Sequence, residues 1–323
     1  MQKKIIYLLI FLLSSCNQLK ESIGDFNEVA IITSNQDKNL IFSEINKFFS
    51  GYVNTPIEEP FYNIKWVDAK DFKKYLKYKN VLLISLLEPI DSTIDLINSK
   101  FSNETDYNIF SVNDYYSRYQ SLIFVNADDS TNFREILNNN KNWILEEVDS
   151  NINSDIQRKV FYNGRNDSLQ NVVSSTFGVN TYIQKDYKLI KKSNDDRFLW
   201  IGRGYPYRWL IFAKFRSEEI GKFDSYLDHF EYLLKNNLEN VTISKYLKKM
   251  LYNSSGNVEY MRGLYEESFS DTGGPFFVKL IKLDAANSLY LSGFVNSPGK
   301  PKYHLLKELE YIIDNTNKCK ELK

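Results

Sequence analysis

Residues 276–295 read FFVKLIKLDAANSLYLSGFV, and this stretch decides the class of fold. Two apolar segments, 276–283 and 289–295, are separated only by a short turn that contains Ala-Ala-Asn-Ser. Strands that succeed one another through short turns, with helices elsewhere in the chain, are typical of α+β proteins with an antiparallel sheet.

The rest of the second half continues this pattern. Asn194-Asp195-Asp196 reads as the turn of a hairpin between two short strands. Strands are predicted at residues 187–190, 198–201, 209–215 and 258–266, and helices at 223–238 and around Leu305, Leu309, Ile312 and Ile313.

The first half mixes strands and helices. Its strands are predicted at 29–32, 61–67, 81–87 and 121–125, and its helices after Ser34, at 68–79, at 90–101 and after Asp128–Thr131, with breaks at Gly164 and Gly178. We predict an α+β fold with a largely antiparallel sheet, or sheets, and helices packed on one face. A single globular unit over residues 28–323 is expected, and two similar halves, 28–183 and 184–323, remain an open alternative.

The first 16 residues predict where the protein resides. Lys3 and Lys4 precede a nine-residue apolar run, which is too short to span a membrane, since a spanning helix needs roughly 20 residues. The sequence Leu-Ser-Ser-Cys16 then resembles a bacterial lipoprotein signal. We expect residues 1–15 to be a cleaved signal peptide, Cys16 to carry the lipid (palmitate), and residues 16–27 to form a tether. Asn17 follows the cysteine, so the outer membrane is the expected location, with its periplasmic face favoured.

The amino-acid composition narrows the range of functions to be considered. Lys and Arg total 41, as do Asp and Glu, so nothing predicts a general affinity for nucleic acid. Apolar residues make up 43% and charged residues 25%, as in packed globular proteins. Of the two cysteines, Cys16 is expected to carry lipid, which leaves Cys319 without a partner for an internal disulfide.

One aromatic stretch, from Trp200 to Trp209, is a candidate binding loop. Guanidinium groups among aromatic rings suit sugar stacking or the binding of carboxylates. The alternative is a hairpin whose aromatic side chains pack inward at alternate positions. The candidate binding residues are Arg203, Tyr205, Tyr207, Arg208, Trp209 and, from a later strand, Arg262.

Three carboxylates form the candidate catalytic set. Glu266, Glu267 and Asp271 could act as general acid and base, as glycosidases use paired carboxylates. The alternative is a strand that ends in a tight Gly-Gly-Pro turn.

Other signatures of catalysis are missing from the sequence. It has no Gly-x-Ser-x-Gly, no His-Glu-x-x-His, no Cys-x-x-Cys and no phosphate loop. We read His229 and His304 as surface residues of helices. The pairs Asp128-Asp129 and Asp195-Asp196 could touch Ca²⁺, but turn or helix-cap roles are favoured. No metal and no cofactor are expected.

Several short stretches resemble an uncharacterised family of Bacteroidota envelope lipoproteins, the domain of unknown function 4837. Besides the Cys16 signal they are Glu58-Glu59-Pro60-Phe61, Phe198-Leu-Trp200, Arg262-Gly-Leu-Tyr-Glu266, Gly273-Gly274-Pro275-Phe276 and Phe294-Val-Asn-Ser-Pro298. They extend over nearly the whole mature chain. The resemblance implies an envelope location and a single full-length unit, and it implies no mechanism.

Taken together, the sequence predicts a non-catalytic envelope lipoprotein that binds a protein or glycan partner. One alternative is a glycan or cell-wall hydrolase that uses the carboxylates near 266–271. Another is a steric assembly factor without a ligand pocket.

Overall fold

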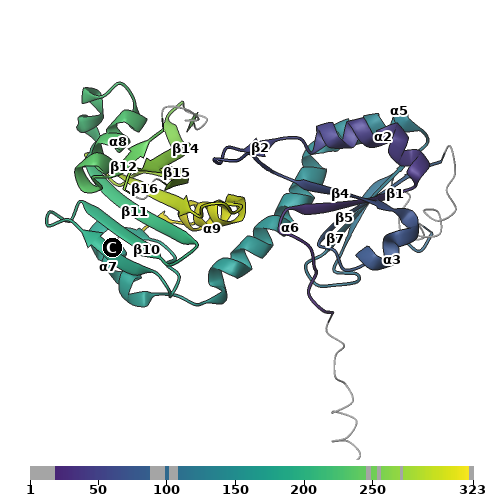
Figure 1. Ribbon diagram of the computed structural model, residues 1–323, viewed down its shortest axis with the longest axis horizontal. Helices are drawn as coiled ribbons and strands as arrows, with labels where there is room; N and C mark the ends of the chain where they lie inside the picture. Colours follow the sequence, from purple (N-terminus) through teal and green to yellow (C-terminus); the bar gives the residue numbers. More distant parts are fainter. Residues whose placement is uncertain are drawn as a thin grey trace, which may run out of the picture. The chain divides into compact units, whose positions relative to one another are not determined.

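The computed structural model describes residues 19–87, 99–101, 108–244, 249–252, 256–269 and 272–319. Cys16, Asp271 and most of the helix predicted at 90–101 lie outside these ranges. The chain forms two compact units. Unit 1 comprises the residues up to Phe49 together with Tyr62–Asn151, and unit 2 comprises Ser50–Phe61 together with Ile152–Lys323 (Figure 1).

Unit 1 is built on a mostly parallel sheet with the strand order β4-β1-β5-β7-β6. Four strands run parallel and β6 is antiparallel at one edge. The central strands β1 and β5 are buried at every position, as expected when helices cover both faces of a parallel sheet. The strands are β1 (Glu28–Thr33), β4 (Asn63–Asp68), β5 (Asn80–Leu86), β6 (Ile109–Asn113) and β7 (Ser121–Ala127).

The helices of unit 1 begin at the predicted caps. In α2 (Asn35–Phe48), Ser34 Oγ accepts a hydrogen bond from Asp37 N. In α5 (Ser130–Asn139), Asp129 accepts hydrogen bonds from two backbone N–H groups, which confirms its role as a cap. These two helices lie over one face of the sheet, and α3 (Phe72–Tyr75) lies over the other (Figure 1).

Two predicted segments of unit 1 differ in the structure. The helix predicted at 68–79 shrinks to a short 3₁₀ turn, η1 (Ala69–Asp71), and α3. It cannot continue because the carbonyls of Leu76 and Tyr78 accept hydrogen bonds from the Gln120 side chain at 2.6 and 2.7 Å. Part of the predicted tether is also fixed to the unit, since Ile23 N donates to Lys77 O and Lys79 N donates to Ile23 O.

Two further helices follow. They are α6 (Lys141–Tyr162) and α7 (Asp167–Phe177), and they are separated by a break at Gly164, as predicted. Gly178 ends α7 in the left-handed conformation, with φ of 67°, which glycine adopts without strain.

Unit 2 contains the predicted antiparallel sheet. Its described strands follow the order β12-β14-β15-β16-β11-β10-β9, β13 also pairs with β14, and every pairing is antiparallel. The largely antiparallel α+β prediction is therefore confirmed. The strands are β9 (Lys188–Lys192), β10 (Phe198–Arg203), β11 (Tyr207–Arg216), β12 (Val241–Ile243), β13 (Lys249–Tyr252), β14 (Val258–Glu267), β15 (Thr272–Lys282) and β16 (Asn287–Asn296).

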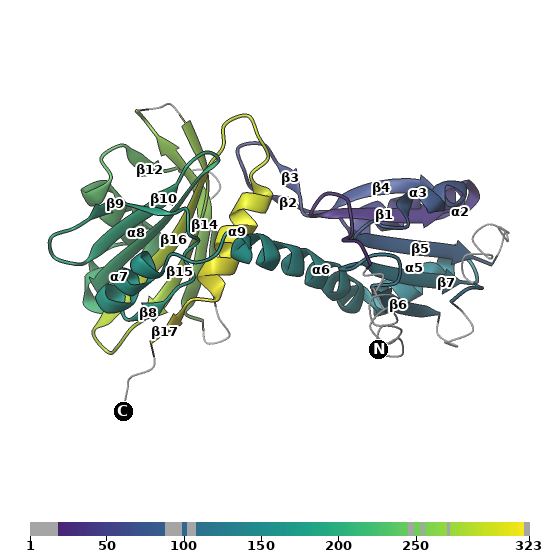
Figure 2. The same cartoon turned by 90° about the horizontal axis from the view of Figure 1, so that it is seen from below.

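Helices cover both faces of this sheet, whereas one covered face was predicted. Tyr290 and Phe294 of β16 pack with α8 (Tyr226–Asn237) in one apolar cluster. Between them Gly293 faces α9 (Tyr303–Asp314), where an added Cβ would lie 2.9 Å from Leu309 Cβ. Figures 1 and 2 both show α8 and α9 on opposite sides of the sheet. Since the two units differ in strand order and direction, they do not form two similar halves.

A short hairpin from the first half of the sequence completes unit 2. It consists of β2 (Tyr52–Val53) and β3 (Glu59–Pro60), and it contacts the N-terminus of α9. Glu59 accepts hydrogen bonds from Lys302 N at 2.7 Å and from Tyr303 N at 2.9 Å. The Phe61 ring meets Tyr303 edge-on. A second small pair joins β8 (Val179–Asn180) to β17 (Asn317–Lys318).

Candidate functional site

The predicted binding loop is the end of the β10–β11 hairpin, where Arg203 lies opposite Arg208. Strand alternation separates its two kinds of side chain. Trp200 and Trp209 pack against the cluster on the α8 face and meet edge-on at 5.4 Å. Arg203 and Arg208 lie on the α9 face. The inward packing that we considered as the alternative therefore accounts for the tryptophans.

The three candidate arginines are engaged within the chain. Arg208 is 5% exposed and forms an ion pair with Glu308 of α9. Burial raises the pKa of Glu308, against the opposing effect of Arg208. Arg203 pairs with Asp186 and donates to Gln184 Oε1.

Arg262 makes the same kind of contact from β14, since it pairs with Glu310 of α9 at 3.0 Å. All three guanidinium groups thus bind acids or amides of their own unit. Of the predicted binding residues, Tyr205 and Tyr207 are the most exposed, at 59% and 46%.

Two of the candidate carboxylates line a cleft. The β14 cleft, of about 640 Å³, lies between the end of β14, the tip of the β2–β3 hairpin and the loop that precedes α9. Glu266 is exposed in it, and Glu267 accepts a hydrogen bond from Phe269 N at 2.8 Å. Its lining consists of Pro56, Ile57, Thr242, Ser244, Leu264–Ser268, Thr272–Gly274, Pro298, Gly299 and Lys302.

Four of the stretches on which the family resemblance depends lie at or beside this cleft, whereas Phe198-Leu-Trp200 does not contribute to it. The lining includes Tyr265, Glu266, Gly273, Gly274 and Pro298 from three of them, and Glu59 of a fourth caps the adjacent helix α9. The glycines are needed for close backbone packing, because a Cβ on residue 274 would lie 1.9 Å from the carbonyl oxygen of Val295.

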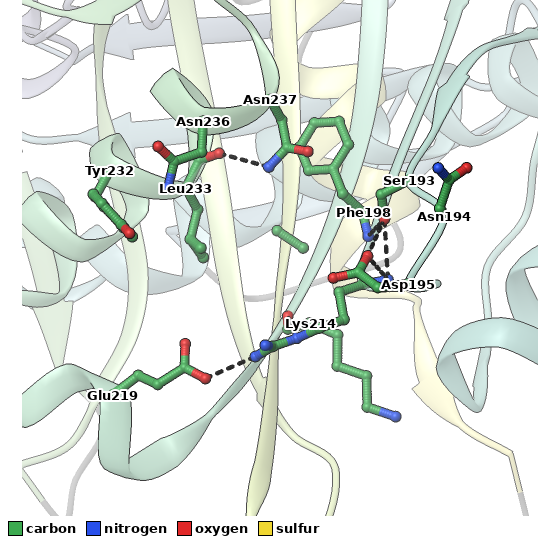
Figure 3. Close-up of a pocket in the computed structure, with 12 residues that line it drawn as sticks. Ser193, Asn194, Asp195, Phe198, Lys214, Glu219, Tyr232, Leu233, Asn236 and Asn237 are labelled. Carbon is green, nitrogen blue, oxygen red and sulfur yellow. Dashed lines mark hydrogen bonds and ion pairs between the residues drawn. The ribbon is translucent and has the colours of Figure 1, made fainter.

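A second cleft lies between α8 and the turn of the β9–β10 hairpin (Figure 3). We call it the α8 cleft; its volume is about 460 Å³. Its lining includes apolar Phe198, Ala213 and Leu233. The polar residues of its lining are Ser193, Asn194, Asp195, Arg197, Lys214, Glu219, Tyr232, Asn236 and Asn237.

Hydrogen bonds fix one wall of the α8 cleft. Ser193 Oγ donates to Asp195 at 2.5 Å, and the Asp195 carboxylate also accepts from Arg197 N. The hydrogen bond from Ser193 lowers the pKa of Asp195 below its usual value, so the carboxylate stays charged. Arg197 reaches across to Glu219 at 2.8 Å. Asp195 therefore stabilises the turn, which fits the turn role that we favoured over Ca²⁺.

Other polar groups of the α8 cleft keep their hydrogen-bonding capacity. Within the described ranges, the side chains of Asn194 and Asn236 form no hydrogen bond or ion pair. Tyr232 is 50% exposed and its ring packs on Phe223 at 5.1 Å. The cleft thus presents amides and an aromatic ring to a ligand.

Neither histidine is among the residues that line the two clefts. His229 is fully buried, so the prediction of a surface position was wrong. Its Nδ1 lies 3.2 Å from Tyr290 Oη in the core, and burial lowers its pKa. His304 is half-buried, and burial lowers its pKa as well.

Two general findings complete the description of the site. In the described ranges, no three His, Cys, Asp or Glu residues gather closely enough to hold a metal ion. No described helix combines the length and the apolar character that a membrane span requires.

The α8 cleft was not predicted from the sequence. Its residues lie between 193 and 237, and the turn, the two strands and the helix α8 that contribute most of them were each predicted, but their convergence on one cleft was not. The spacing of Tyr232 and Asn236, one helical turn apart, is the one local signal that places both side chains on the same side of α8.

The fold and its clefts define a two-unit chain whose second unit carries clefts with polar linings. Residues 166–315 match the family described as "Domain of unknown function (DUF4837)". Residues 22–160 match a second family, "Domain of unknown function (DUF8532)". The resemblance to the domain of unknown function 4837 is therefore confirmed for residues 166–315, which are the second half of the chain rather than nearly all of it.

Comparison with solved structures gives only weak likenesses. A crystal structure from Bacteroides thetaiotaomicron is 14% identical, with a TM-score of 0.23, and the match covers 46% of this chain and 47% of the other. A mutant of Mog1 is 10% identical, with a TM-score of 0.29 and coverages of 44% and 91%.

LpqN, described as involved in cell envelope biogenesis of Mycobacterium tuberculosis, is 13% identical, with a TM-score of 0.26 and coverages of 43% and 82%. The chain spans about half the length of the first of these structures. No curated protein matches the sequence. These likenesses carry no argument about function.

Proposed function

We propose that this chain is a lipid-anchored, non-catalytic binding protein of the cell envelope, and that unit 2 binds a glycan in the α8 cleft. One observation supports the choice of cleft. Asn194 and Asn236 flank an apolar floor without using their side chains in hydrogen bonds of the described structure, beside a half-exposed Tyr232 ring.

The chemistry of this lining suits sugars. A side-chain amide both donates and accepts hydrogen bonds, so it can match a hydroxyl group in either role. The face of a sugar ring carries C–H groups that pack on an aromatic ring, while its hydroxyl groups point outward. Tyr232 supplies the ring, and Asn194 and Asn236 supply the amides. The open clefts favour ligand binding over a purely steric role.

Binding can be tested with defined oligosaccharides. The full-length protein in detergent would be titrated calorimetrically with hexasaccharides of glucose, mannose, N-acetylglucosamine and galacturonate. For a hexasaccharide that binds, Asn236→Ala should weaken binding roughly threefold to tenfold, since one or two hydrogen bonds are lost. Tyr232→Ala should weaken it about tenfold.

Tyr207→Ala is the matched control, because Tyr207 is 46% exposed and Tyr232 is 50% exposed. Loss of binding in Tyr207→Ala alone would assign the site to the β10–β11 loop instead. If no hexasaccharide binds, the glycan assignment is wrong.

The membrane anchor rests on the sequence, since Cys16 lies outside the described residues. The basic start, the short apolar run and Ser-Ser-Cys16 support cleavage before Cys16 and its lipidation. Several acyl chains would hold the chain stably, at about 0.8 kcal/mol for each buried methylene. Metabolic labelling with palmitate should mark the wild type and not Cys16→Ser, and an equal label in both would exclude this anchor.

A hydrolase acting at the β14 cleft is the second candidate. It is favoured by the position of Glu266 and Glu267 on the lining of a cleft, as a pair of glycosidase carboxylates would require. Hydrolysis of cell-wall fragments by the wild type, with loss of activity in both Glu266→Gln and Glu267→Gln, would establish it. An inactive wild type would end this candidate.

A further inference from the structure

The central strands of unit 1, β1, β5 and β7, run parallel and therefore begin at the same edge of the sheet. The segment that precedes β1 pairs there with the segments that precede β5 and β7. Ile23 N donates to Lys77 O at 2.8 Å. Arg118 N donates to Lys20 O at 2.9 Å. We call this region the anchor edge, and it consists of Leu19–Asp25, Leu76–Lys79 and Asp114–Gln120.

The anchor edge lies close to the proposed lipid. The described part of the chain begins at Leu19, three residues after Cys16. Three residues span at most about 11 Å, even when fully extended. Backbone hydrogen bonds hold the chain on unit 1 from Lys20 onward. Because the acyl chains on Cys16 would insert into the bilayer, the tether is short enough to keep this edge at the membrane surface.

Apolar side chains are exposed on the anchor edge. Leu19 is 39% exposed, Ile23 is 50% exposed and Tyr115 is 49% exposed. Tyr115 belongs to the loop that enters β7, and its ring meets Phe101 edge-on at 4.8 Å. A tyrosine suits the interface between membrane and water, because its ring is apolar and its hydroxyl group is polar. Leucine and isoleucine side chains gain free energy when they leave water.

Charge does not distinguish this surface. Its solvent-accessible cations are matched by as many acids, namely Lys20, Lys77 and Arg118 against Glu21, Asp25 and Asp114. Arg118 and Glu21 also form an ion pair with each other at 3.5 Å. Contact between this edge and a bilayer would therefore depend on the apolar side chains, and lipids without net charge should be sufficient.

We infer that the anchor edge of unit 1 docks on the surface of the bilayer, with Leu19, Ile23 and Tyr115 in contact with the lipid interface. This inference rests on the proposed lipid anchor at Cys16 and adds a second contact with the membrane. It also defines an orientation of unit 1, in which the carboxyl ends of β1, β5 and β7 point away from the bilayer. Leu87 lies at that far end of β5, roughly 26 Å of extended chain from Lys79.

Fluorescence quenching by lipids tests this orientation. The full-length lipidated protein, with Cys319→Ser as background, would carry a thiol-linked fluorophore at Ile23→Cys or at Leu87→Cys. It would be reconstituted in phosphatidylcholine vesicles that contain a lipid with a nitroxide on its head group. The two positions are matched, because Ile23 is 50% exposed and Leu87 is 52% exposed. Since they lie at opposite ends of the parallel strands, the label at Ile23 should be quenched about threefold more strongly, or more.

Variants test the contribution of the side chains. With the fluorophore at Ile23→Cys, the combined change Leu19→Ser and Tyr115→Ser should lower the quenching by about half, because the edge loses apolar contact with the lipid. Leu87→Ser is the control and should leave the quenching unchanged. All three side chains are well exposed, so their replacement should leave unit 1 folded.

Two results would overturn the inference and leave the lipid anchor standing. The first is equal quenching at Ile23→Cys and Leu87→Cys in a protein that carries palmitate. The second is unchanged quenching after Leu19→Ser and Tyr115→Ser, which would show that these side chains do not contact the bilayer. Absence of palmitate from the wild type would instead refute the proposed anchor, and docking through this edge with it.

Discussion

Removing the acid from the buried Arg208–Glu308 pair should unfold unit 2 at a much lower temperature. The two side chains are only 6% and 10% exposed. In Glu308→Ala the guanidinium of Arg208 stays buried without its counter-ion, which costs roughly 3–5 kcal/mol. For a unit of this size each kcal/mol lowers the melting temperature by about 2–4 °C, so the expected fall is roughly 6–20 °C.

Differential scanning calorimetry of the full-length protein measures this change. Glu218→Ala is the control, because Glu218 belongs to an ion pair whose side chains are 69% and 77% exposed, and such a pair contributes at most about 1 kcal/mol. The double variant Arg208→Met with Glu308→Leu should melt close to the wild type, since no charge remains buried. If the double variant melts as low as Glu308→Ala, the cost does not come from the unpaired charge and the reasoning fails.

Three further predictions concern other parts of the fold. Gly274→Ala should prevent unit 2 from folding, because its Cβ would meet the Val295 carbonyl at 1.9 Å; a normal calorimetric transition would contradict this. Glu59→Ala should lower the free energy of unfolding, measured with urea, by about 1 kcal/mol, because the N-terminus of α9 loses its cap. Glu58→Ala is the control and should leave this free energy unchanged, because Glu58 is exposed. Burial lowers the pKa of His229 in the folded state below its ordinary value of 6.5. Its contribution to stability is therefore complete above pH 6.5 and is lost as the pH falls below that value. Between about pH 7.5 and 5.5, the free energy of unfolding of His229→Gln should depend less on pH than that of the wild type.

Local signals in the sequence predicted local structure well. Ser34 and Asp129 cap the helices that follow them, and the turn at 194–196 joins β9 to β10. Each of these features depends on residues within one or two turns of chain. The direction of the strands in unit 1 was missed, because an apolar run such as β5 indicates burial on both faces but does not tell which neighbour it pairs with.

The candidate site was harder to predict because its contacts are distant in sequence. Arg208 reads as a free cation in an aromatic loop, yet its partner Glu308 is 100 residues away. The α8 cleft likewise depends on packing α8 beside the hairpin turn, which no single stretch specifies. Glu266 and Glu267 were singled out as a possible general acid and base, and the structure places both on the lining of the β14 cleft. The sequence alone did not show which of the clefts has unengaged polar groups.

The hairpin at Ser50–Phe61 also has a consequence for how the protein is made. Its Glu59 binds the backbone of Lys302, 243 residues further along the chain. A ribosome adds about 5–20 residues per second, so the hairpin waits on the order of 10–50 s before its partner helix exists. During that time the segment that caps α9 has no binding site to occupy. Unit 2 can therefore reach its final structure only after its last helix has been synthesised, and a shortened chain that begins after residue 61 would lack the cap of that helix.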